Sequence, residues 1–212
     1  MIDNKSLKKA LEQVLAQKGS RKFEQSVELA INFRGIDFNK PENRLNLEIP
    51  LPKGKGRESK IAVFADGQLA SEAKTAGADM VLAGDMIEKL AKDKPTLKKY
   101  VSEYTFLAEP KLMVVVGKHL GQVLGARGKM PKPLMGKNLQ ELMERTRRTV
   151  SVKSKGKYMP VVHVAVGTEK MSPEDLLENV VAVIEAVKAK VGEANIKNVY
   201  LKLTMGTPVK VS

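Results

Sequence analysis

The feature that most constrains this sequence is a change in hydrophobic pattern between its two ends and its middle. Near both ends apolar and polar residues alternate, as with Val27, Leu29 and Ile31 in the stretch SVELAINFRG. Such alternation predicts β-strands with one buried face, which is typical of antiparallel sheets. In the middle, the runs IAVFAD and MVLAG are apolar without alternation, and helical stretches follow them. That pattern predicts a parallel sheet covered by helices.

The two ends of the chain carry similar sets of elements. Each end supplies one amphipathic helix, expected over residues 4–19 and 172–192. The second helix has Ser172 and Pro173 at its start and Gly192 as its stop, which are typical boundary residues. We expect the alternating strands at 26–35, 44–52, 159–167 and 198–206.

The economical architecture is a discontinuous α+β domain with an α/β domain inserted into it. The α+β domain, an antiparallel sheet with two helices, would comprise residues 1–60 plus 155–212. The inserted domain, a three-layer, Rossmann-like α/β fold, would occupy residues 61–154. The crossing segments, 53–60 and 152–157, are basic and contain glycine, and they would run side by side as a hinge. The alternative is one continuous mixed sheet with basic surface loops.

The second half of the insert contains a glycine-rich stretch. A helix is expected over 86–100, and the runs FLAEP and LMVVVG that follow it are interpreted as strands. Glycines then stand at residues 117, 121, 125 and 128. This spacing differs from Gly-x-Gly-x-x-Gly, and the phosphate-loop motif is absent, so no nucleotide-binding loop is predicted. Glycines four residues apart on a helix favour close backbone packing, and the basic turn at 127–132 could bind phosphate.

The charge balance indicates the class of partner. Lys and Arg number 37 and Asp and Glu 24, which gives a formal net charge of +13. This excess points to a polyanion, either nucleic acid or an anionic membrane surface. Residues 111–150 carry nine basic and two acidic residues, whereas residues 61–110 carry six and eight. A membrane surface is disfavoured, because neither clear helix combines a basic face with bulky aromatic anchors.

Several classes of chemistry are excluded by composition. The chain has no cysteine, and His119 and His163 are its only histidines. Disulfides, thiol catalysis, cysteine-based zinc sites and multi-histidine metal sites are therefore not expected, and we predict no cofactor. No motif for a catalytic nucleophile is present, so an enzyme is not expected. Apolar runs fall short of the ~20 residues of a membrane span, and the N-terminus lacks a signal-peptide core, so we expect a cytoplasmic protein.

The last alternating strand ends in Thr204-Met205-Gly206. Gly206 and the nearby Pro208 would serve in an ordinary turn. A small hydroxyl, a flexible thioether and a glycine in a row also form a surface that another backbone can approach closely. RNA minor grooves are recognised through their 2′-hydroxyls and their shape, which suits such residues.

Several motifs in order along the chain together resemble the family of large ribosomal subunit protein one, the protein of the ribosome's mobile lateral stalk. They are KFEQSVEL at 22–29, RGID at 34–37, LGARGKMPKP at 124–133, VHVAVG at 162–167 and Thr204-Met205-Gly206. The bacterial pattern after RGID is charged and carries Asp-Gln-Asn, whereas this chain has FNKPENRLN. The chain therefore resembles the archaeal branch of the family.

The resemblance implies a two-domain structural protein that binds large-subunit ribosomal RNA through the discontinuous domain. It also implies that the protein assists release of deacylated tRNA from the exit site and represses translation of its own mRNA by binding it. No enzymatic activity, cofactor or membrane is implied, and the protein would be a monomer off the ribosome. The alternative is an enzyme that acts through the α/β domain on a nucleotide or phosphorylated ligand, which would need the missing phosphate loop.

The resemblance further implies a set of RNA contacts, carried over position by position. The lysines among them would neutralise phosphates and make affinity salt-dependent, and the hydroxyls would exchange hydrogen bonds with 2′-hydroxyls. The phenylalanine and methionine would offer apolar contact to sugars or an unstacked base. Two of the residues, Lys40 and Arg44, lie where the sequence departs from the bacterial pattern. The full set is Lys22, Phe23, Ser26, Lys40, Arg44, His163, Gly167, Thr204, Met205 and Gly206.

Overall fold

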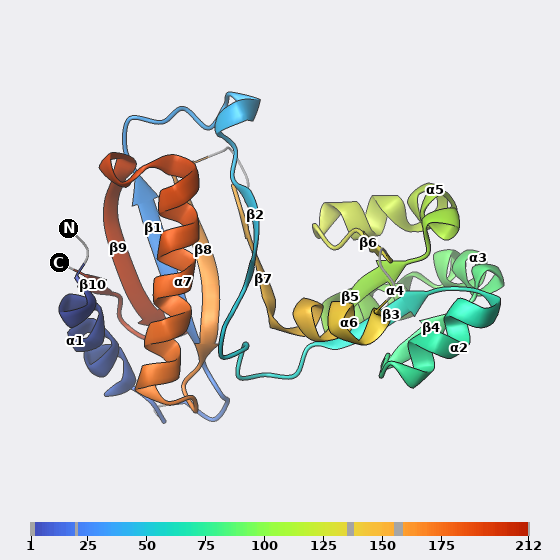
Figure 1. Cartoon of the computed structure of the whole chain (residues 1–212), viewed down its shortest axis with the longest axis horizontal. Helices are drawn as coiled ribbons and strands as arrows, with labels where there is room; N and C mark the ends of the chain where they lie inside the picture. Colours follow the sequence, from blue (N-terminus) through green and yellow to red (C-terminus); the bar gives the residue numbers. More distant parts are fainter. Residues whose placement is uncertain (1–2, 20, 135–137, 155–158, 212) are drawn as a thin grey trace. The chain divides into compact units, whose positions relative to one another are not determined.

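The computed structural model in Figure 1 describes residues 3–19, 21–134, 138–154 and 159–211. The chain groups into two compact units, each with its own hydrophobic core. Unit 1 comprises Met1–Arg57 and Arg148–Ser212, and unit 2 comprises Glu58–Arg147. The chain is thus of mixed α and β type, with an antiparallel sheet in unit 1 and a parallel sheet in unit 2.

Unit 1 is built on a four-stranded antiparallel sheet with the strand order β10-β9-β1-β8. Helices α1 (Asn4–Leu15) and α7 (Pro173–Val191) pack on one face of this sheet, and one core joins them to its alternate residues. The antiparallel, half-buried strands predicted for the chain ends are therefore confirmed. The four strands are β1 (Ser26–Phe33), β8 (Val161–Thr168), β9 (Ile196–Leu203) and β10 (Val209–Val211).

Helix α7 begins and ends where its sequence predicts. The Ser172 hydroxyl accepts a hydrogen bond from the Asp175 N–H at 3.1 Å, and Pro173 occupies the first turn, where it costs no hydrogen bond. Gly192 ends the helix with a φ of +84°, a left-handed conformation that side-chain-bearing residues rarely adopt.

A buried asparagine on α7 fixes the chain after β2. Asn179 is fully buried, and its side chain completes three hydrogen bonds with main-chain groups. Its Oδ1 accepts from the Lys53 N–H at 3.1 Å, and its Nδ2 donates to the carbonyls of Gly54 and Val166 at 2.8 Å each. One side chain thus joins the segment after β2, strand β8 and helix α7. A buried amide satisfied in this way is costly to replace.

A second, two-stranded antiparallel sheet in unit 1 pairs β2 (Asn46–Pro50) with β7 (Thr149–Lys153). The sequence interpretation places the crossing segments 53–60 and 152–157 side by side as a hinge and assigns residues 149–153 to the insert. In the structure the paired strands begin earlier in the sequence than these crossing segments: Asn46 lies opposite Lys153, and Pro50 lies opposite Thr149. Residues 155–157 of the second crossing lie outside the described residues.

Unit 2 has a four-stranded parallel sheet with the order β4-β3-β5-β6, covered on both faces by helices. Ala62 and Phe64 of β3 face the core formed with α3, α4 and α5, whereas Ile61 and Val63 face the core formed with α2 and α6. Three layers result, as the unalternating apolar runs predict. The strands are β3 (Lys60–Phe64), β4 (Met80–Leu82), β5 (Tyr104–Ala108) and β6 (Lys132–Pro133); the helices are α2 (Gly67–Thr75), α3 (Gly84–Lys92), α4 (Lys94–Glu103), α5 (Pro110–Ala126) and α6 (Leu139–Arg148).

Two elements of unit 2 differ from the sequence prediction. The run LMVVVG, interpreted as a strand, lies inside helix α5, because Val116 begins a buried i, i+4 stripe while Val114 is 77% exposed. The single helix expected over 86–100 is two helices. Pro95 has no N–H to donate a hydrogen bond within a continuous helix. The Asp93 side chain instead caps the start of α4, where it accepts a hydrogen bond from the Thr96 N–H at 3.2 Å.

The glycines of α5 do not pack against another part of the described chain. A Cβ placed on Gly117 or Gly121 would meet nothing within 4 Å, and one on Gly125 would only reach Met130 Sδ at 4.0 Å. The prediction that their spacing allows close backbone packing is therefore wrong for contacts among the described residues.

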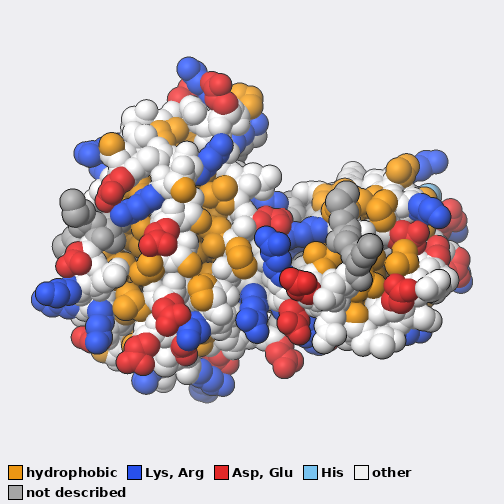
Figure 2. Space-filling view, viewed as in Figure 1, with side chains coloured by type: hydrophobic (Ala, Val, Ile, Leu, Met, Phe, Trp, Pro, Cys, Tyr) orange, Lys and Arg blue, Asp and Glu red, His pale blue; other side chains and the backbone are white. Residues whose placement is uncertain are grey.

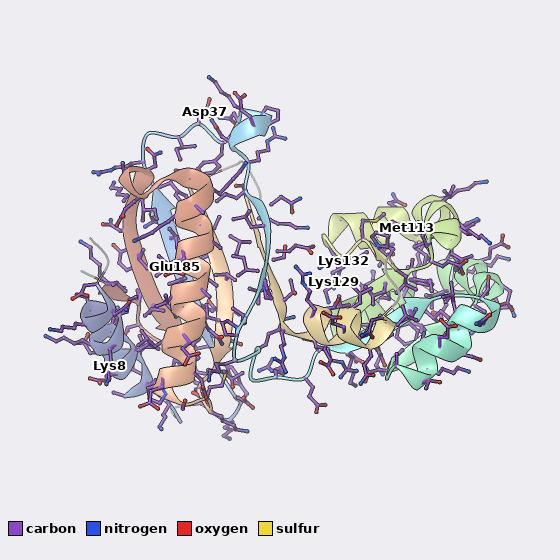
Figure 3. The ribbon with its side chains drawn as sticks, in the orientation of Figure 1. Lys8, Asp37, Met113, Lys129, Lys132 and Glu185 are labelled. Atoms are coloured by element: carbon purple, nitrogen blue, oxygen red, sulfur yellow. The ribbon has the colours of Figure 1, made fainter. Side chains whose placement is uncertain are left out.

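Lys129 of the basic turn is a structural residue. Its Nζ donates to the main-chain oxygens of Ser102 at 3.1 Å and Tyr104 at 3.2 Å, at the end of α4 (Figure 3). Burial, and then the neighbouring Arg127, lowers the pKa of Lys129 below its ordinary value. Phosphate binding by this turn would therefore compete with two existing acceptors at Lys129.

We expect Lys129→Met to destabilise unit 2 by about 1–2 kcal/mol, because two carbonyl oxygens lose a charged donor while the aliphatic stem is kept. Urea denaturation followed by circular dichroism measures the change. Lys118→Met, at an exposed position on α5 with no ion pair among the described residues, is the matched control. Equal stability of the two variants would contradict the structural role.

Two further features concern the described residues only. None of their helices is long and apolar enough to cross a bilayer. Their His, Asp and Glu side chains form no cluster of three or more arranged to hold a metal ion.

Candidate nucleic-acid interface

Most of the predicted contact residues meet at one end of the antiparallel sheet of unit 1. Because β1 runs antiparallel to both β8 and β9, its first residue lies beside the last residues of those strands: Ser26 pairs with Thr168, and Val27 with Leu203 (Figure 1). We call residues 22–26, 168–171 and 204–207, which lie at this end, the loop cluster. Segments almost 180 positions apart in sequence thus form one surface.

Hydrogen bonds between Ser26 and Thr204 join the first and third segments of the loop cluster. The Thr204 N–H donates to the Ser26 carbonyl at 3.1 Å, and the Ser26 N–H donates to Thr204 Oγ1 at 3.2 Å. The Thr204 hydroxyl in turn donates to the Ser26 carbonyl at 3.3 Å. Because the proton of this hydroxyl is already used within the chain, the hydroxyl can accept a hydrogen bond from an RNA 2′-hydroxyl but cannot donate one. The sequence interpretation expects both.

Gln25 holds all three segments of the loop cluster together and was missed by the sequence interpretation. Only 1% of this residue is exposed. Its Oε1 accepts from the Met205 N–H at 3.1 Å, and its Nε2 donates to Glu169 Oε2 at 3.3 Å. Its own carbonyl accepts from the Glu169 N–H at 3.0 Å. An isolated glutamine before a strand gives no signal of burial, so only the fold identifies it.

Gln17, just after α1, fixes the end of the third segment. Its Oε1 accepts from both the N–H and the hydroxyl of Thr207, at 2.9 and 3.0 Å. A Cβ on Gly206 would lie 2.9 Å from the same oxygen, so a larger residue there would disturb this contact. The glycine of the triplet therefore lets α1 approach the turn closely.

Two apolar side chains of the loop cluster are exposed to solvent. Phe23 is 52% exposed and Met205 is 59% exposed, so neither is a core residue. Lys22 beside Phe23 is also exposed and has no ion pair among the described residues. Exposed apolar groups next to an unpaired lysine are suited to contact sugar or base together with phosphate.

An ion pair within the loop cluster joins its first and second segments. Lys170 Nζ lies 3.1 Å from Glu24 Oε2, and Arg57 Nη2 donates to the Glu24 carbonyl at 3.2 Å. The Thr168 hydroxyl, followed by the Lys170 ammonium, holds the pKa of Glu24 below its ordinary value of 4.5. Glu24 is therefore ionised at neutral pH, and the two cations offset its repulsion of a polyanion. No motif points to Lys170 or Arg57, and only the fold places them here.

His163 and Gly167 lie on β8, outside the loop cluster as defined. His163 is exposed and pairs with Ala30, five residues before the end of the strand, on the sheet face opposite the helices. Gly167 is buried: a Cβ there would lie 2.5 Å from Leu176 Cδ2 and 2.7 Å from Met171 Sδ. Packing against α7 by itself accounts for this glycine.

Lys40 and Arg44 lie at the other end of β1, in the loop labelled by Asp37 in Figure 3. Arg44 folds back on this loop, where its Nη2 donates to the Asn39 carbonyl at 3.0 Å and its Nε to the Phe38 carbonyl at 3.4 Å. The structure therefore does not bring these two residues to the loop cluster. Any RNA contact they make belongs to a separate part of unit 1.

Basic and acidic side chains are interspersed over the face of unit 1 seen in Figure 2, with hydrophobic side chains gathered in its middle.

Residues 11–207 match the sequence profile of a family of ribosomal proteins. That family is the ribosomal protein L1p/L10e family, and the chain belongs to it. It is accordingly a structural ribosomal protein of the cytoplasm and not an enzyme.

Archaeal relatives resemble the chain over nearly its whole length. The large ribosomal subunit protein uL1 of Methanocella arvoryzae is 44% identical, over 95% of this chain and 96% of the relative. The protein of the same name from Thermococcus kodakarensis is 43% identical, over 99% of this chain and 98% of the relative. The resemblance to the archaeal branch read from the motifs is therefore confirmed.

Proposed function

We propose that the chain binds large-subunit ribosomal RNA through the loop cluster of unit 1. The observation that carries the proposal is the convergence of three distant segments into one surface, held by Gln25 and presenting Lys22, Phe23 and Met205 to solvent. Several archaeal relatives are named as large ribosomal subunit protein uL1, which supports the same subunit for this chain. In the lateral stalk the protein assists release of deacylated tRNA from the exit site.

The chemistry of the surface supports RNA in particular. Unpaired lysine supplies a phosphate contact, and exposed Phe23 and Met205 supply apolar contact to ribose or base. The Ser26 hydroxyl, without a partner among the described residues, and the remaining lone pair of Thr204 can meet 2′-hydroxyls. Filter binding with a stalk fragment of ribosomal RNA, and with DNA of the same sequence, tests the proposal. Equal affinity for both, or a melting shift with ATP, GTP or NAD and none with RNA, would contradict it.

Phe23→Ala is expected to lower RNA affinity about tenfold, because stacking or apolar contact of one ring contributes roughly 1–3 kcal/mol. Stability should change by less than about 1 kcal/mol, since the ring is already half exposed. Filter binding and thermal melting measure the two effects. A large loss of melting temperature with normal affinity of the folded molecules would show that the ring has a structural role instead.

The same surface is proposed to recognise the chain's own mRNA and so repress its translation. One site cannot hold two RNAs, so the ribosomal fragment should displace the leader of the message in a competition assay. Simultaneous binding of both RNAs would place mRNA recognition elsewhere on the protein.

We also propose that unit 2 is an inserted domain and that unit 1 folds and binds RNA without it. The two places where the chain leaves and re-enters unit 1 are close together in space. The Leu51 N–H donates to the Arg148 carbonyl at 3.1 Å, and the adjacent strands β2 and β7 are paired. A short linker can therefore replace Glu58–Arg147 at modest entropic cost.

Joining Arg57 to Arg148 through a short Gly-Ser linker should give a folded remnant that retains most of the RNA affinity. Circular dichroism and filter binding measure both properties. The salt dependence of binding should fall only if the removed basic residues touch phosphates. An unfolded remnant would contradict the insertion, and a folded remnant without affinity would move RNA recognition to unit 2.

A further inference from the structure

Helix α1 presents three exposed lysines that form no ion pair among the described residues. Its buried stripe, which includes Leu7, Leu11 and Val14, packs into the core of unit 1. Lys5, Lys8 and Lys9 are spaced i, i+3 and i+4, so they lie together on the opposite, exposed face. Figure 3 shows Lys8 pointing away from the rest of the unit. We call these three residues the α1 lysine face.

Lys5 is poorly placed to stabilise the helix that carries it. It lies in the first turn, where the positive end of the helix dipole disfavours a cation, and Asp3 at the N-cap makes no capping hydrogen bond with its side chain. The pairs Lys5–Lys8 and Lys5–Lys9 also place like charges on neighbouring turns, which destabilises a helix. Helix α7 has the opposite arrangement, with acidic residues in its first turn and lysines in its last.

The three lysines are also without ion partners. Among the described residues, none of them forms a salt bridge or a side-chain hydrogen bond, although lysines elsewhere in unit 1, such as Lys53, Lys170 and Lys202, do so. The exposed carboxylate of Glu12 lies one turn from Lys8 and Lys9, so three lysines and one glutamate leave this face with a net charge of 3 − 1 = +2, which attracts an external polyanion.

The end of the helix that carries the α1 lysine face lies next to the loop cluster. Gln17, just beyond the end of α1, holds Thr207 of the cluster through two hydrogen bonds. Exposed Lys18, Arg21 and Lys22 then lead along the chain to Phe23. From the helical rise, Lys9 lies roughly 12 Å and Lys5 roughly 18 Å along the axis from Gln17. A phosphate backbone that leaves the cluster and follows the exposed face of α1 reaches these lysines within a few nucleotides.

We infer that the α1 lysine face is a second contact site for RNA, which binds the phosphate backbone next to the segment held by the loop cluster. The inference rests on the proposed function, because it takes the loop cluster as the place from which the RNA extends. Ammonium groups on exposed stems recognise phosphate as point charges and carry no base preference, so this contact adds affinity without sequence specificity.

The test uses the full-length chain with the triple substitution K5Q/K8Q/K9Q and the stalk fragment of ribosomal RNA over a salt series. Affinity should fall about tenfold or more at low salt, and the slope of log K against log salt should become shallower by about 2–3, since each lost phosphate contact changes it by about 0.9. Glutamine keeps the helix, which circular dichroism verifies.

Two further proteins make the outcome interpretable. The control K74Q/K92Q/K98Q removes the same charge from exposed positions of unit 2 and should leave the slope unchanged. The loop-cluster double variant T204A/M205A should lose affinity at every salt concentration. If that double variant loses affinity while K5Q/K8Q/K9Q binds like its control, the inference fails and the proposed function stands. If the unsubstituted chain does not bind the fragment, both fail.

A vesicle-binding experiment distinguishes RNA phosphates from the phosphates of lipid headgroups. Vesicles of phosphatidylcholine with phosphatidylserine are sedimented with each protein. Vesicle binding that K5Q/K8Q/K9Q abolishes, together with unchanged RNA affinity, would assign the α1 lysine face to a lipid surface and overturn the inference.

Discussion

Replacing Thr204 and Met205 together by alanine is expected to weaken binding of the ribosomal RNA fragment by about 2 kcal/mol, or roughly 30-fold. Met205 contributes an exposed thioether, 59% accessible, and Thr204 contributes an acceptor for a 2′-hydroxyl at the end of β9. Because the Thr204 hydroxyl also bonds the Ser26 main chain, the double variant should lose about 1 kcal/mol of stability. Filter binding and urea denaturation measure the two effects separately.

Met159→Ala is the matched control for this loss. Met159 is exposed to the same extent, 59%, but it precedes β8 at the end of the strand away from the loop cluster. Its replacement should leave affinity within about twofold of the unsubstituted chain, as is usual for a surface change away from a site. A double variant that binds like this control, or one that unfolds, would remove Thr204-Met205-Gly206 from the interface.

Asn179→Leu should destabilise the protein more than any other of these single substitutions, by about 3–4 kcal/mol. The size of the side chain is nearly kept, yet the N–H of Lys53 and the carbonyls of Gly54 and Val166 lose their partner inside the protein. Buried polar groups left unpaired cost their full desolvation. Thermal melting should show a decrease of roughly 10 °C.

Asn198→Leu is the control for the chemistry of this substitution. Asn198 lies half-buried on β9, and its side chain makes no hydrogen bond among the described residues. Its replacement should change stability by less than about 1 kcal/mol. A similar loss in both variants would mean that the three hydrogen bonds of Asn179 do not stabilise unit 1.

The arrangement of the loop cluster ties RNA recognition to local stability. Gln25, Gln17 and the Thr204 hydroxyl fix the segments that carry Phe23 and Met205. Lys22, Phe23 and Met205, proposed to touch RNA, are exposed, whereas Gln17 and Gln25, which position them, are partly or wholly buried. The half-buried Thr204 has both roles. Substitution of the exposed side chains should therefore lower affinity alone, whereas substitution of Gln17, Gln25 or Thr204 should lower both affinity and melting temperature.

Residue patterns and local motifs were enough to predict the type of secondary structure in each part of the chain. Alternation with a period of two identified the half-buried strands of unit 1, and unbroken apolar runs identified the parallel sheet of unit 2. Ser172, Pro173 and Gly192 identified the bounds of α7, since capping depends on a few local residues. The motifs identified the family, and through it they predict Phe23, Ser26 and the Thr204-Met205-Gly206 triplet as RNA contacts.

The sequence pattern gave a wrong prediction where it is compatible with more than one secondary structure or more than one strand partner. LMVVVG is short and apolar, which suits a strand or a buried helix, and the pairing of α5 with its neighbours selected the helix. The residues 149–153 were assigned to the insert, because a strand does not reveal its partner until the chain has folded.

The residues that share a surface are brought together by strand order and register. Antiparallel pairing of β1 with β8 and β9 brings Gln25 to Glu169 and Met205, and it places Lys170 beside Glu24. The same fold buries Gly167 and sends Lys40 and Arg44 to the opposite end of β1. The physical reason is that hydrogen bonds and packing between distant segments depend on strand order and register, and no local spacing of residues encodes either.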